Sequence, residues 1–273
     1  MTSRVLCRVN RLLEQTAATG PVLGLDTSTQ IASLAIVARG KVVGSISRPL
    51  ISHGSALPGV VDELLSSSGL KIRDLGAIAV GTGPGSFTGL RIGISFAKGL
   101  AMASGCALVG VPGFDAIALA ALERNNIDEG RMVCVVVDAR KGEVYAALYR
   151  VVADGLEKLS EELVIALKHL ASQITEDTMF VGDERAKDAA ALVESRGHRV
   201  AVFNLGKLDM RGACVAALGG ADFARGETDR AASIEPLYIR TPEATFKPTS
   251  KSPAGIGTEG VWSIERKNSF GNI

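Results

Sequence analysis

The distribution of apolar residues over the first part of the chain predicts short strands followed by a helix. Residues 22–25, 31–38 and 41–46 are apolar or alternating runs that are typical of β-strands, with a tight hairpin turn at Arg39-Gly40. Between residues 53 and 68, apolar residues recur every three or four positions, which is the period of an amphipathic helix. The apolar face of that helix consists of Leu57, Val60, Val61, Leu64 and Leu65.

A glycine-rich stretch follows a short apolar run at residues 77–80, which predicts a buried strand. Glycines and a proline at residues 81–86 predict a sharp turn, and we expect a helix from Phe87 onward. This helix has a small residue at every fourth position: Gly89, Gly93, Ala97 and Ala101. Glycine inside a helix costs about 1 kcal/mol relative to alanine. The row therefore indicates close approach, either by a neighbouring element of the same fold or by a helix of another chain.

The strand pattern restarts in the second half. Residues 132–151 read MVCVVVDARKGEVYAALYRV, a strand that ends in Asp138, then a polar turn and a second strand. Asp138 lies 112 residues after Asp26, which ends the strand at residues 22–25 and also precedes a polar turn. We interpret this as a weak internal duplication of two α/β halves. The remaining expected elements are strands at 107–111, 178–181 and 199–202, and helices at 114–124, 167–172, 184–195 and 210–224.

The glycine loop does not match the common nucleotide-binding motifs. A Walker loop requires G-x-x-x-x-G-K-[ST], and a dinucleotide fingerprint requires G-x-G-x-x-G. Gly81, Gly83, Gly85 and Gly89 lack the third glycine of the fingerprint, and no lysine follows at the Walker offset. Exposed amides before a helix can bind an anion, but a tight turn before a closely packed helix is the simpler interpretation.

Composition predicts a globular protein with an ample core. Of 273 residues, 47% are hydrophobic and 22% charged, which at roughly 150 residues per domain allows one large or two medium domains. The net charge is +1 without a basic cluster, so strong binding of nucleic acid by this chain alone is not expected. Its four cysteines, without C-x-x-C spacing, predict reduced residues of a cytoplasmic protein. No apolar run reaches the length of a membrane span.

Two strand-end aspartates are the candidate chemical groups. Asp26 and Asp138, facing a cleft between two halves, are placed as in an enzyme that holds a metal ion and orients water to split a nucleotide. The alternative is that each caps its own turn, because an aspartate bonds readily to amides two residues on.

Other catalytic motifs are missing or incomplete. His53, His169 and His198 are too far apart in sequence for a metalloprotease motif. Ser86 lies in P-G-S-F-T rather than in the G-x-S-x-G sequence of a serine hydrolase. We therefore expect no catalytic residue of these classes and no metal ligand.

Several segments together resemble a known family. They are LGLDTST near residue 24, the helix at residues 53–68, GPGSFTGLRIG at 83–93, VDARKGEVYAALY at 137–149 and EPLYIR at 235–240. These closely resemble the TsaB (YeaZ) family of bacterial tRNA threonylcarbamoyladenosine (t6A) biosynthesis proteins, which is also described as glycoprotease-like. The GPGSFTGLR run is the specific part, and the resemblance extends from about residue 22 to residue 240.

The resemblance implies a particular domain organisation. It implies an α/β protein with two duplicated domains of the actin-like, Hsp70-like and sugar-kinase-like (ASKHA) fold. We expect these at residues 21–111 and 112–240, with a C-terminal segment of the second domain that returns towards the first. Residues 1–20 are expected to be an N-terminal extension, and residues 241–273, rich in Pro, Gly, Ser and Thr, a flexible tail.

The resemblance also implies a role and partners. It implies a non-catalytic scaffold subunit that supports a catalytic TsaD-like subunit, together with a TsaE-like ATPase, and that needs no cofactor. The complex transfers a threonylcarbamoyl group to N6 of the adenosine beside the anticodon. The chain would therefore bind tRNA as part of the complex rather than alone. Relatives that bind metal carry a histidine pair on a helix, whereas this chain has only His53 in that region.

Pairing with the catalytic subunit is expected to use the helices at residues 53–68 and 87–104. The expected interface residues are Leu57, Val61, Leu64, Gly89, Gly93, Ala97 and Ala101. Small residues would let a partner helix approach closely, so Gly93→Leu should block pairing and leave the monomer folded. The same face could instead meet a second copy of the chain in a homodimer. The alternative hypothesis is a nucleotide-hydrolysing or phosphotransfer enzyme that uses Asp26 and Asp138.

Overall fold

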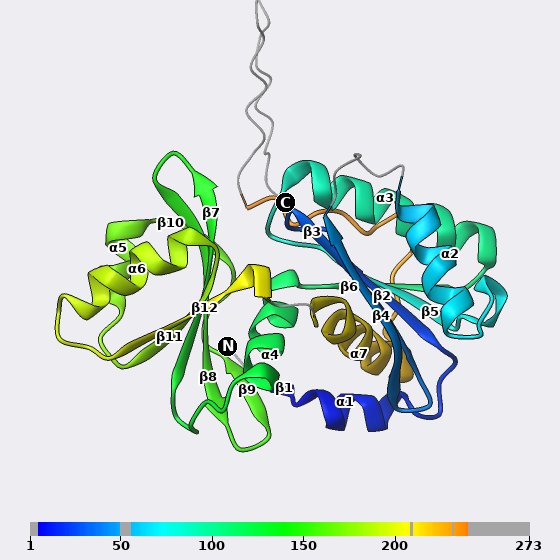
Figure 1. Cartoon of the computed structure of the whole chain (residues 1–273), viewed down its shortest axis with the longest axis horizontal. Coiled ribbons are helices and arrows are strands. Elements are labelled where there is room, and N and C mark those ends of the chain that lie inside the picture. Colours follow the sequence, from blue (N-terminus) through cyan, green and yellow to red (C-terminus); the bar gives the residue numbers. More distant parts are fainter. Residues whose placement is uncertain (1–4, 50–55, 208–209, 231, 240–273) are drawn as a thin grey trace, which may run out of the picture. The chain divides into compact units, whose positions relative to one another are not determined.

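Two β-sheets with helices packed against them make up the structure (Figure 1). The computed structural model describes residues 5–49, 56–207, 210–230 and 232–239. These residues all belong to one compact unit, Met1–Thr241, and the fold is mixed α/β, as expected. The tail predicted at residues 241–273 and His53 both lie outside the described residues.

The first sheet contains the strands expected from the first half of the sequence. Its order is β4-β3-β2-β5-β6. Strand β3 is antiparallel to both β2 and β4, and β2, β5 and β6 are parallel to one another. Arg39 and Gly40 form the predicted hairpin turn, both with positive φ. The strands are β2 (Val22–Asp26), β3 (Ile31–Ala38), β4 (Lys41–Pro49), β5 (Ala77–Gly81) and β6 (Ala107–Val111).

Alternation along β2 determines which helices cover each face of this sheet. Leu23 and Leu25 point into a core cluster shared with α2 (Leu57–Ser67) and α3 (Phe87–Ser104). Val22 points to the opposite face, because successive side chains of a strand alternate. On that face Gly24 lets α7 (Arg211–Ala224) approach, since a Cβ at Gly24 would lie 2.3 Å from the carbonyl oxygen of Gly212.

The second sheet has the order β1-β9-β8-β7-β11-β12, with β10 paired to β8. One face is covered by α5 (Leu167–Gln173) and α6 (Glu184–Glu194), and α4 (Gly113–Arg124) contributes to the core on the other. The two short strands β9 and β10 were not expected from the sequence. The strands are β1 (Val5–Cys7), β7 (Met132–Arg140), β8 (Glu143–Val152), β9 (Gly155–Lys158), β10 (Leu163–Ala166), β11 (Thr178–Gly182) and β12 (Val200–Asn204).

The two sheets repeat one strand arrangement. In each, the first strand, β2 or β7, pairs antiparallel with the next strand along the chain, and that strand pairs with a third. On its other side, the first strand pairs parallel with β5 or β11, and that strand pairs parallel with β6 or β12. Asp26 and Asp138 therefore occupy equivalent places at the carboxyl ends of β2 and β7. The shared topology concerns strand order and direction, and the duplication itself stays a prediction.

The N-terminal segment is not the separate extension that we expected for residues 1–20. Strand β1 pairs with β9, and α1 (Val9–Thr16) packs against α7. Leu6, Val9 and Leu12 are buried in a core cluster that also contains residues of α4, α7 and both sheets. The apolar spacing of α1 was visible in the sequence, but its main packing partner, α7, begins only at Arg211. The other domain boundaries stay predictions.

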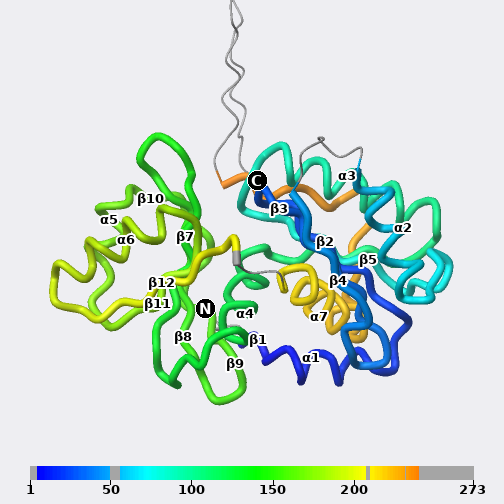
Figure 2. Tube along the Cα trace, viewed as in Figure 1, coloured from blue at the N-terminus to red at the C-terminus, as the bar shows by residue number. Residues whose placement is uncertain are grey.

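The C-terminal part of the described chain lies against the first sheet (Figure 2). The amide of Asp229 donates to the carbonyl of Leu108 at 2.9 Å, and its carboxylate accepts from the amide of Gly110 at 2.9 Å. Ile234 is buried in the cluster under α2 and α3. The amide of Leu237 then donates to the carbonyl of Thr82 at 2.8 Å. This segment therefore covers the free edge of β6.

A buried ion pair anchors the beginning of α7 to the end of β2. Arg211 is 1% exposed, and its Nε donates to Oδ2 of Asp26 at 2.8 Å. The remaining guanidinium donors bond to Thr29 Oγ1, to the carbonyl of Ile31 and to the carbonyl of Leu205. These hydrogen bonds replace those that water would make, so they offset the free-energy cost of burying the two charges.

Two expectations from composition concern the membrane and the cysteines. Among the described helices, none combines the length and apolar character needed to cross a bilayer. Cys7, Cys106, Cys134 and Cys214 are free thiols. Burial raises the pKa of Cys134 and Cys214, so both thiols stay protonated and unreactive.

Leu12→Ala should lower the free energy of unfolding by about 2–5 kcal/mol, because it removes a buried side chain from the core shared by α1 and α7. Gln15→Ala, on the exposed face of the same helix, is the matched control and should change stability by less than about 0.5 kcal/mol. Both values are measured by urea unfolding. Equal effects would mean that α1 is not part of the cooperative fold.

Arg211→Met should destabilise the protein by about 3–5 kcal/mol, because the Asp26 carboxylate would stay buried without its counter-charge. The double variant Arg211→Met/Asp26→Asn should recover part of this loss. Arg199→Met removes an ion pair to Asp177 in which the arginine is 87% exposed, and it should cost at most about 1 kcal/mol. Unfolding by denaturant that shows a similar small loss for Arg211→Met would contradict the role assigned to this pair.

Candidate functional site

The row of small residues on α3 packs against the turn that follows β2. A Cβ at Gly93 would lie 2.1 Å from Oγ1 of Thr27, and a Cβ at Gly89 would lie 2.1 Å from the carbonyl oxygen of Thr27. The hydroxyl of Thr27 donates to the carbonyl of Gly89 at 2.7 Å. The close approach predicted from the glycine spacing is therefore made within this chain.

The glycine loop before α3 is also occupied by groups of the same chain. The amide of Ser86 donates to the carbonyl of Ser28 at 2.8 Å, and a Cβ at Gly85 would lie 2.5 Å from that oxygen. Ser86 caps α3, because its Oγ accepts from the amide of Gly89. The amide of Gly113 donates to the carbonyl of Gly83 at 2.8 Å. These contacts favour the tight turn over an anion site, and they make Ser86 a capping residue rather than a nucleophile.

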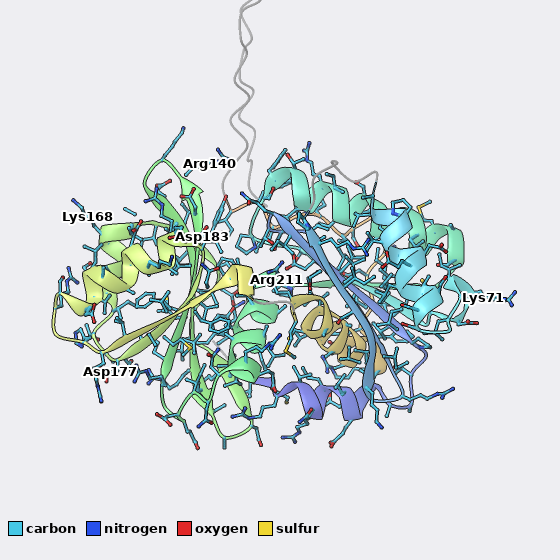
Figure 3. All side chains as sticks on the ribbon, viewed as in Figure 1. Lys71, Arg140, Lys168, Asp177, Asp183 and Arg211 are labelled. Carbon is cyan, nitrogen blue, oxygen red and sulfur yellow. The ribbon has the colours of Figure 1, made fainter. Side chains whose placement is uncertain are left out.

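Asp26 is not available to a metal ion or substrate. Its side chain is buried, Oδ1 accepts from the amide of Ser28 at 2.8 Å, and Oδ2 accepts from Arg211. Figure 3 shows Arg211 inside the fold rather than at its surface. The candidate role of Asp26 in nucleotide chemistry is therefore corrected: this aspartate caps its turn and pairs with a buried arginine.

Asp138 lies in the equivalent place but is 40% exposed. Its Oδ1 accepts from the amide of Arg140 at 3.1 Å and from Nε of Arg185 at 3.2 Å. Asp183, which caps α6, accepts from the amide of Asp138 at 2.9 Å. The i to i+2 bond again matches the turn-capping alternative.

Possible metal ligands are not clustered in the structure. Within the described ranges, no three His, Cys, Asp or Glu residues are grouped so that they could hold a metal ion. His169 instead lies 2.9 Å from the side chain of Gln173, with its Nε2 facing the amide nitrogen. Asp26 and Asp138 are each neutralised by a different arginine, so the structure supplies no paired-carboxylate site from them.

The side chains predicted to form the partner interface face the interior. Ala97 and Ala101 belong to the same buried cluster as the apolar face of α2, and Gly89 and Gly93 face Thr27. All seven predicted interface residues are buried: Leu57, Val61, Leu64, Gly89, Gly93, Ala97 and Ala101. Their prediction as a contact surface is therefore wrong. Periodicity identifies the face of a helix that must be covered, but it does not say what covers it. Gly93→Leu is therefore no longer expected to leave the monomer folded, because the leucine side chain would collide with Thr27.

The opposite faces of α2 and α3 are open. Gly59 and Gly99 lie within these helices, and a Cβ at either position would have no atom within 4 Å. Met102 is 78% exposed, and Ser95 is exposed on the same helix. Among the described residues, nothing packs closely against these two glycine positions, and glycine inside a helix costs about 1 kcal/mol relative to alanine. Since the inward faces are buried, these outward faces are the part of α2 and α3 that a partner could contact.

A cluster at the beginning of α3 was missed by the sequence analysis. Nε of Arg91 donates to the hydroxyl of Tyr238 at 2.9 Å, and its guanidinium lies 4.2 Å from the centre of the Phe87 ring. The two rings are 5.3 Å apart. Phe87 and Arg91 come from GPGSFTGLR and Tyr238 from EPLYIR, so two segments that carry the resemblance meet here. The signal was present in each segment, but their contact depends on the returning C-terminal segment.

A second buried charge cluster lies on α4 and the second sheet. Lys158 pairs with Asp115 at 3.0 Å and with Glu162 at 2.8 Å, and the Tyr149 hydroxyl donates to Asp115 at 2.9 Å. Burial, and then the Asp115 carboxylate, raise the pKa of Tyr149. Burial alone would lower the pKa of Lys158, but the two carboxylates hold it above its usual value. Asp115, an acid near the start of the apolar run FDAIALAALER, was the sequence signal for this cluster.

Comparison with protein families and sequences identifies relatives over most of the chain. The family model described as "TsaD: tRNA N6-adenosine threonylcarbamoyltransferase" matches residues 50–252. The tRNA threonylcarbamoyladenosine biosynthesis protein TsaB of Haemophilus influenzae is 30% identical over 237 residues, covering 83% of this chain and 95% of the relative. The TsaB protein of Escherichia coli is 36% identical over 129 residues, covering 47% and 54%.

Comparison with solved structures identifies a relative of the same family. YeaZ from Pseudomonas aeruginosa is similar with a TM-score of 0.67 and 28% identity, covering 80% of this chain and 99% of that chain. The resemblance carried by GPGSFTGLR and its companion segments is thus confirmed, over nearly the whole length of the Haemophilus influenzae and Pseudomonas aeruginosa relatives. The chain belongs to the TsaB (YeaZ) family of tRNA threonylcarbamoyladenosine biosynthesis proteins.

Proposed function

We propose that this chain is a non-catalytic subunit in the biosynthesis of threonylcarbamoyladenosine (t6A) in tRNA. It pairs with a TsaD-like threonylcarbamoyltransferase and supports transfer to the adenosine beside the anticodon. The observation that carries the non-catalytic role is the state of Asp26: both carboxylate oxygens are already bonded, one of them to the buried Arg211. The relatives named TsaB support the pathway.

The proposal includes the architecture and the other partners implied by the family. The repeated strand order supports two duplicated domains of the actin-like, Hsp70-like and sugar-kinase-like fold. A TsaE-like ATPase and tRNA bind to the complex rather than to this chain alone, and the complex acts in the cytoplasm. The match to the TsaD family model supports a catalytic partner related to this chain, since related subunits often pair through equivalent surfaces.

The pairing surface that we propose is the outward face of α2 and α3. Gly59 and Gly99 leave backbone exposed on these helices, and Met102 adds a large exposed apolar side chain. A partner helix in contact with Gly99 would compensate for the cost of glycine at that position. The inward row of small residues, in contrast, is already covered by Thr27.

Reconstitution tests the proposed function directly. With tRNA transcript, the threonylcarbamoyl adenylate, a TsaD-like subunit and a TsaE-like ATPase, threonylcarbamoyl transfer should depend on this chain, as measured by nucleoside mass spectrometry. The chain alone should produce no modification. Transfer at full rate without this chain would contradict the subunit role, and transfer by this chain alone would contradict the non-catalytic role.

Gly99→Leu should weaken pairing with the TsaD-like subunit by at least about tenfold, or 1.4 kcal/mol, because the new side chain would hold the partner helix away. The monomer should stay folded, since the position is open. Ala191→Leu, on the exposed part of α6, is the control and should pair normally. Affinity is measured by calorimetry, and light scattering on the free chain reports whether Gly99→Leu also dissolves a homodimer. Unchanged pairing would show that this face of α3 is not the interface.

A further inference from the structure

The turn between β7 and β8 holds basic residues in a backbone conformation that such residues rarely adopt. Arg140 has φ +66° and Lys141 has φ +54°. Lys141 and Gly142 form the two-residue loop, and the strand register shifts beside Arg140, between Asp138 and the turn. Primed hairpin turns favour Asn-Gly or Gly-Gly, and a bulge residue with positive φ is usually glycine. Both positions therefore store strain that a different residue would relieve.

Stored strain of this kind indicates a function outside the turn itself. Residues in sparsely populated backbone regions persist where the surrounding structure holds them there, and they cluster at functional sites. Within the described ranges, the non-glycine residues with positive φ are Arg39, Arg140 and Lys141, and all three are basic. Asparagine tolerates this conformation far better than arginine or lysine does. The side chains of Arg140 and Lys141, rather than the turn conformation, are thus what needs explaining.

The charge on Arg140 is not used by the described part of the protein. Its backbone amide donates to Asp138, but the carboxylate of Asp138 is paired with Arg185, and no described side chain accepts from the Arg140 guanidinium. Lys141 and Glu143, at the same turn, do have partners. Arg140 is exposed and projects from the tip of the hairpin (Figure 3). An exposed guanidinium on a rigid hairpin is suited to bidentate contact with an oxyanion.

A second free cation lies on the element next to the turn. The amide of Leu167 approaches the carbonyl of Gly142 at 3.4 Å, so α5 begins beside the hairpin. Lys168 follows directly, is exposed and points outward in Figure 3, with no ion pair to a described residue. The exposed residues of the turn, 140–142, and of the start of α5, 168–169, include no apolar side chain.

We propose that Arg140 and Lys168 contact the phosphodiester backbone of the tRNA when this chain is assembled with its partners. This inference rests on the proposed function, which supplies the RNA. A protein partner would be expected to bury an apolar centre at its interface, whereas a phosphate backbone requires only cations at a suitable spacing. Two contacts of this kind add affinity without sequence preference, which fits the low net charge of +1.

The test uses the full chain in complex with the TsaD-like subunit, with an unmodified tRNA transcript as the probe. Arg140→Glu and Lys168→Glu should each weaken tRNA binding by roughly fivefold, and each should lower the slope of log affinity against log salt by about 1. Lys71→Glu, an exposed position on the first half of the chain, is the matched charge control and should leave binding unchanged. Binding is measured by fluorescence anisotropy over a salt series.

Arg140→Asn separates function from stability. It should raise the melting temperature by about 2 °C, because asparagine relieves the strain, and yet weaken tRNA binding. Arg39→Asn makes the same change in the other hairpin and should raise the melting temperature without affecting tRNA. Arg140→Asn that binds tRNA like the unchanged chain would overturn the inference.

The remaining outcomes distinguish this inference from the proposed function. If the complex with the unchanged chain binds tRNA normally and the Arg140 and Lys168 variants do too, only the phosphate contact is wrong. If the complex with the unchanged chain neither binds nor modifies tRNA, the proposed function itself fails. Loss of pairing with the TsaD-like subunit, with tRNA binding retained, would assign the turn to an acidic protein surface and would also overturn the inference.

Discussion

The ion pair between Asp26 and Arg211 is the interaction on which the rest of the structure depends. It joins the end of the first core strand to the beginning of α7, two groups separated by 185 positions in the chain. Gly24 and Gly212 allow the helix to lie close enough for the pair to form. Because the pair is buried, removing either partner would leave a charge without compensation. The same contact thus orders the fold and closes the strand end to other ligands.

Closure of this strand end is the observation on which the proposed non-catalytic role rests. A carboxylate that is to hold a metal ion or orient water must keep at least one oxygen accessible, and Asp26 keeps neither. The glycine loop that follows β5 is closed in the same way, by Thr27 and Ser28. In the described residues, the end of β2 and the glycine loop are thus occupied by groups of this chain itself.

The two topologically equivalent turns are used in different ways. The turn after β2 is buried beneath α3, where Gly89 and Gly93 make room for it. The turn after β7 is exposed, and it carries Arg140 and Lys141 in a strained conformation. One turn therefore stabilises the first half of the protein, while the other presents charge to the outside. Equivalent positions in a repeated strand order need not have equivalent roles, because their surroundings come from different helices.

Local patterns in the sequence determined most of the secondary structure. The bounds of β3 and β6, the extent of α3 and the hairpin at Arg39-Gly40 follow from alternation, small-residue spacing and turn chemistry. The strand β1 and the packing of α1 did not follow, because they depend on β9 and α7, which are distant in the chain. The short strands β9 and β10 also did not follow, although both pair with the nearby β8. The family was also recognisable from the sequence, since GPGSFTGLR and VDARKGEVY are contiguous runs of residues.

Only the tertiary structure decided which groups meet. The sequence required that something approach Gly89 and Gly93, but Thr27, more than 60 positions earlier, was as compatible with the spacing as a helix of another protein. It likewise marked Asp26 as a strand-end acid without indicating Arg211. Periodicity reports which face of an element must be covered, because burial depends on the local repeat. The identity of the covering group depends on how distant segments fold back, and no local pattern contains that information.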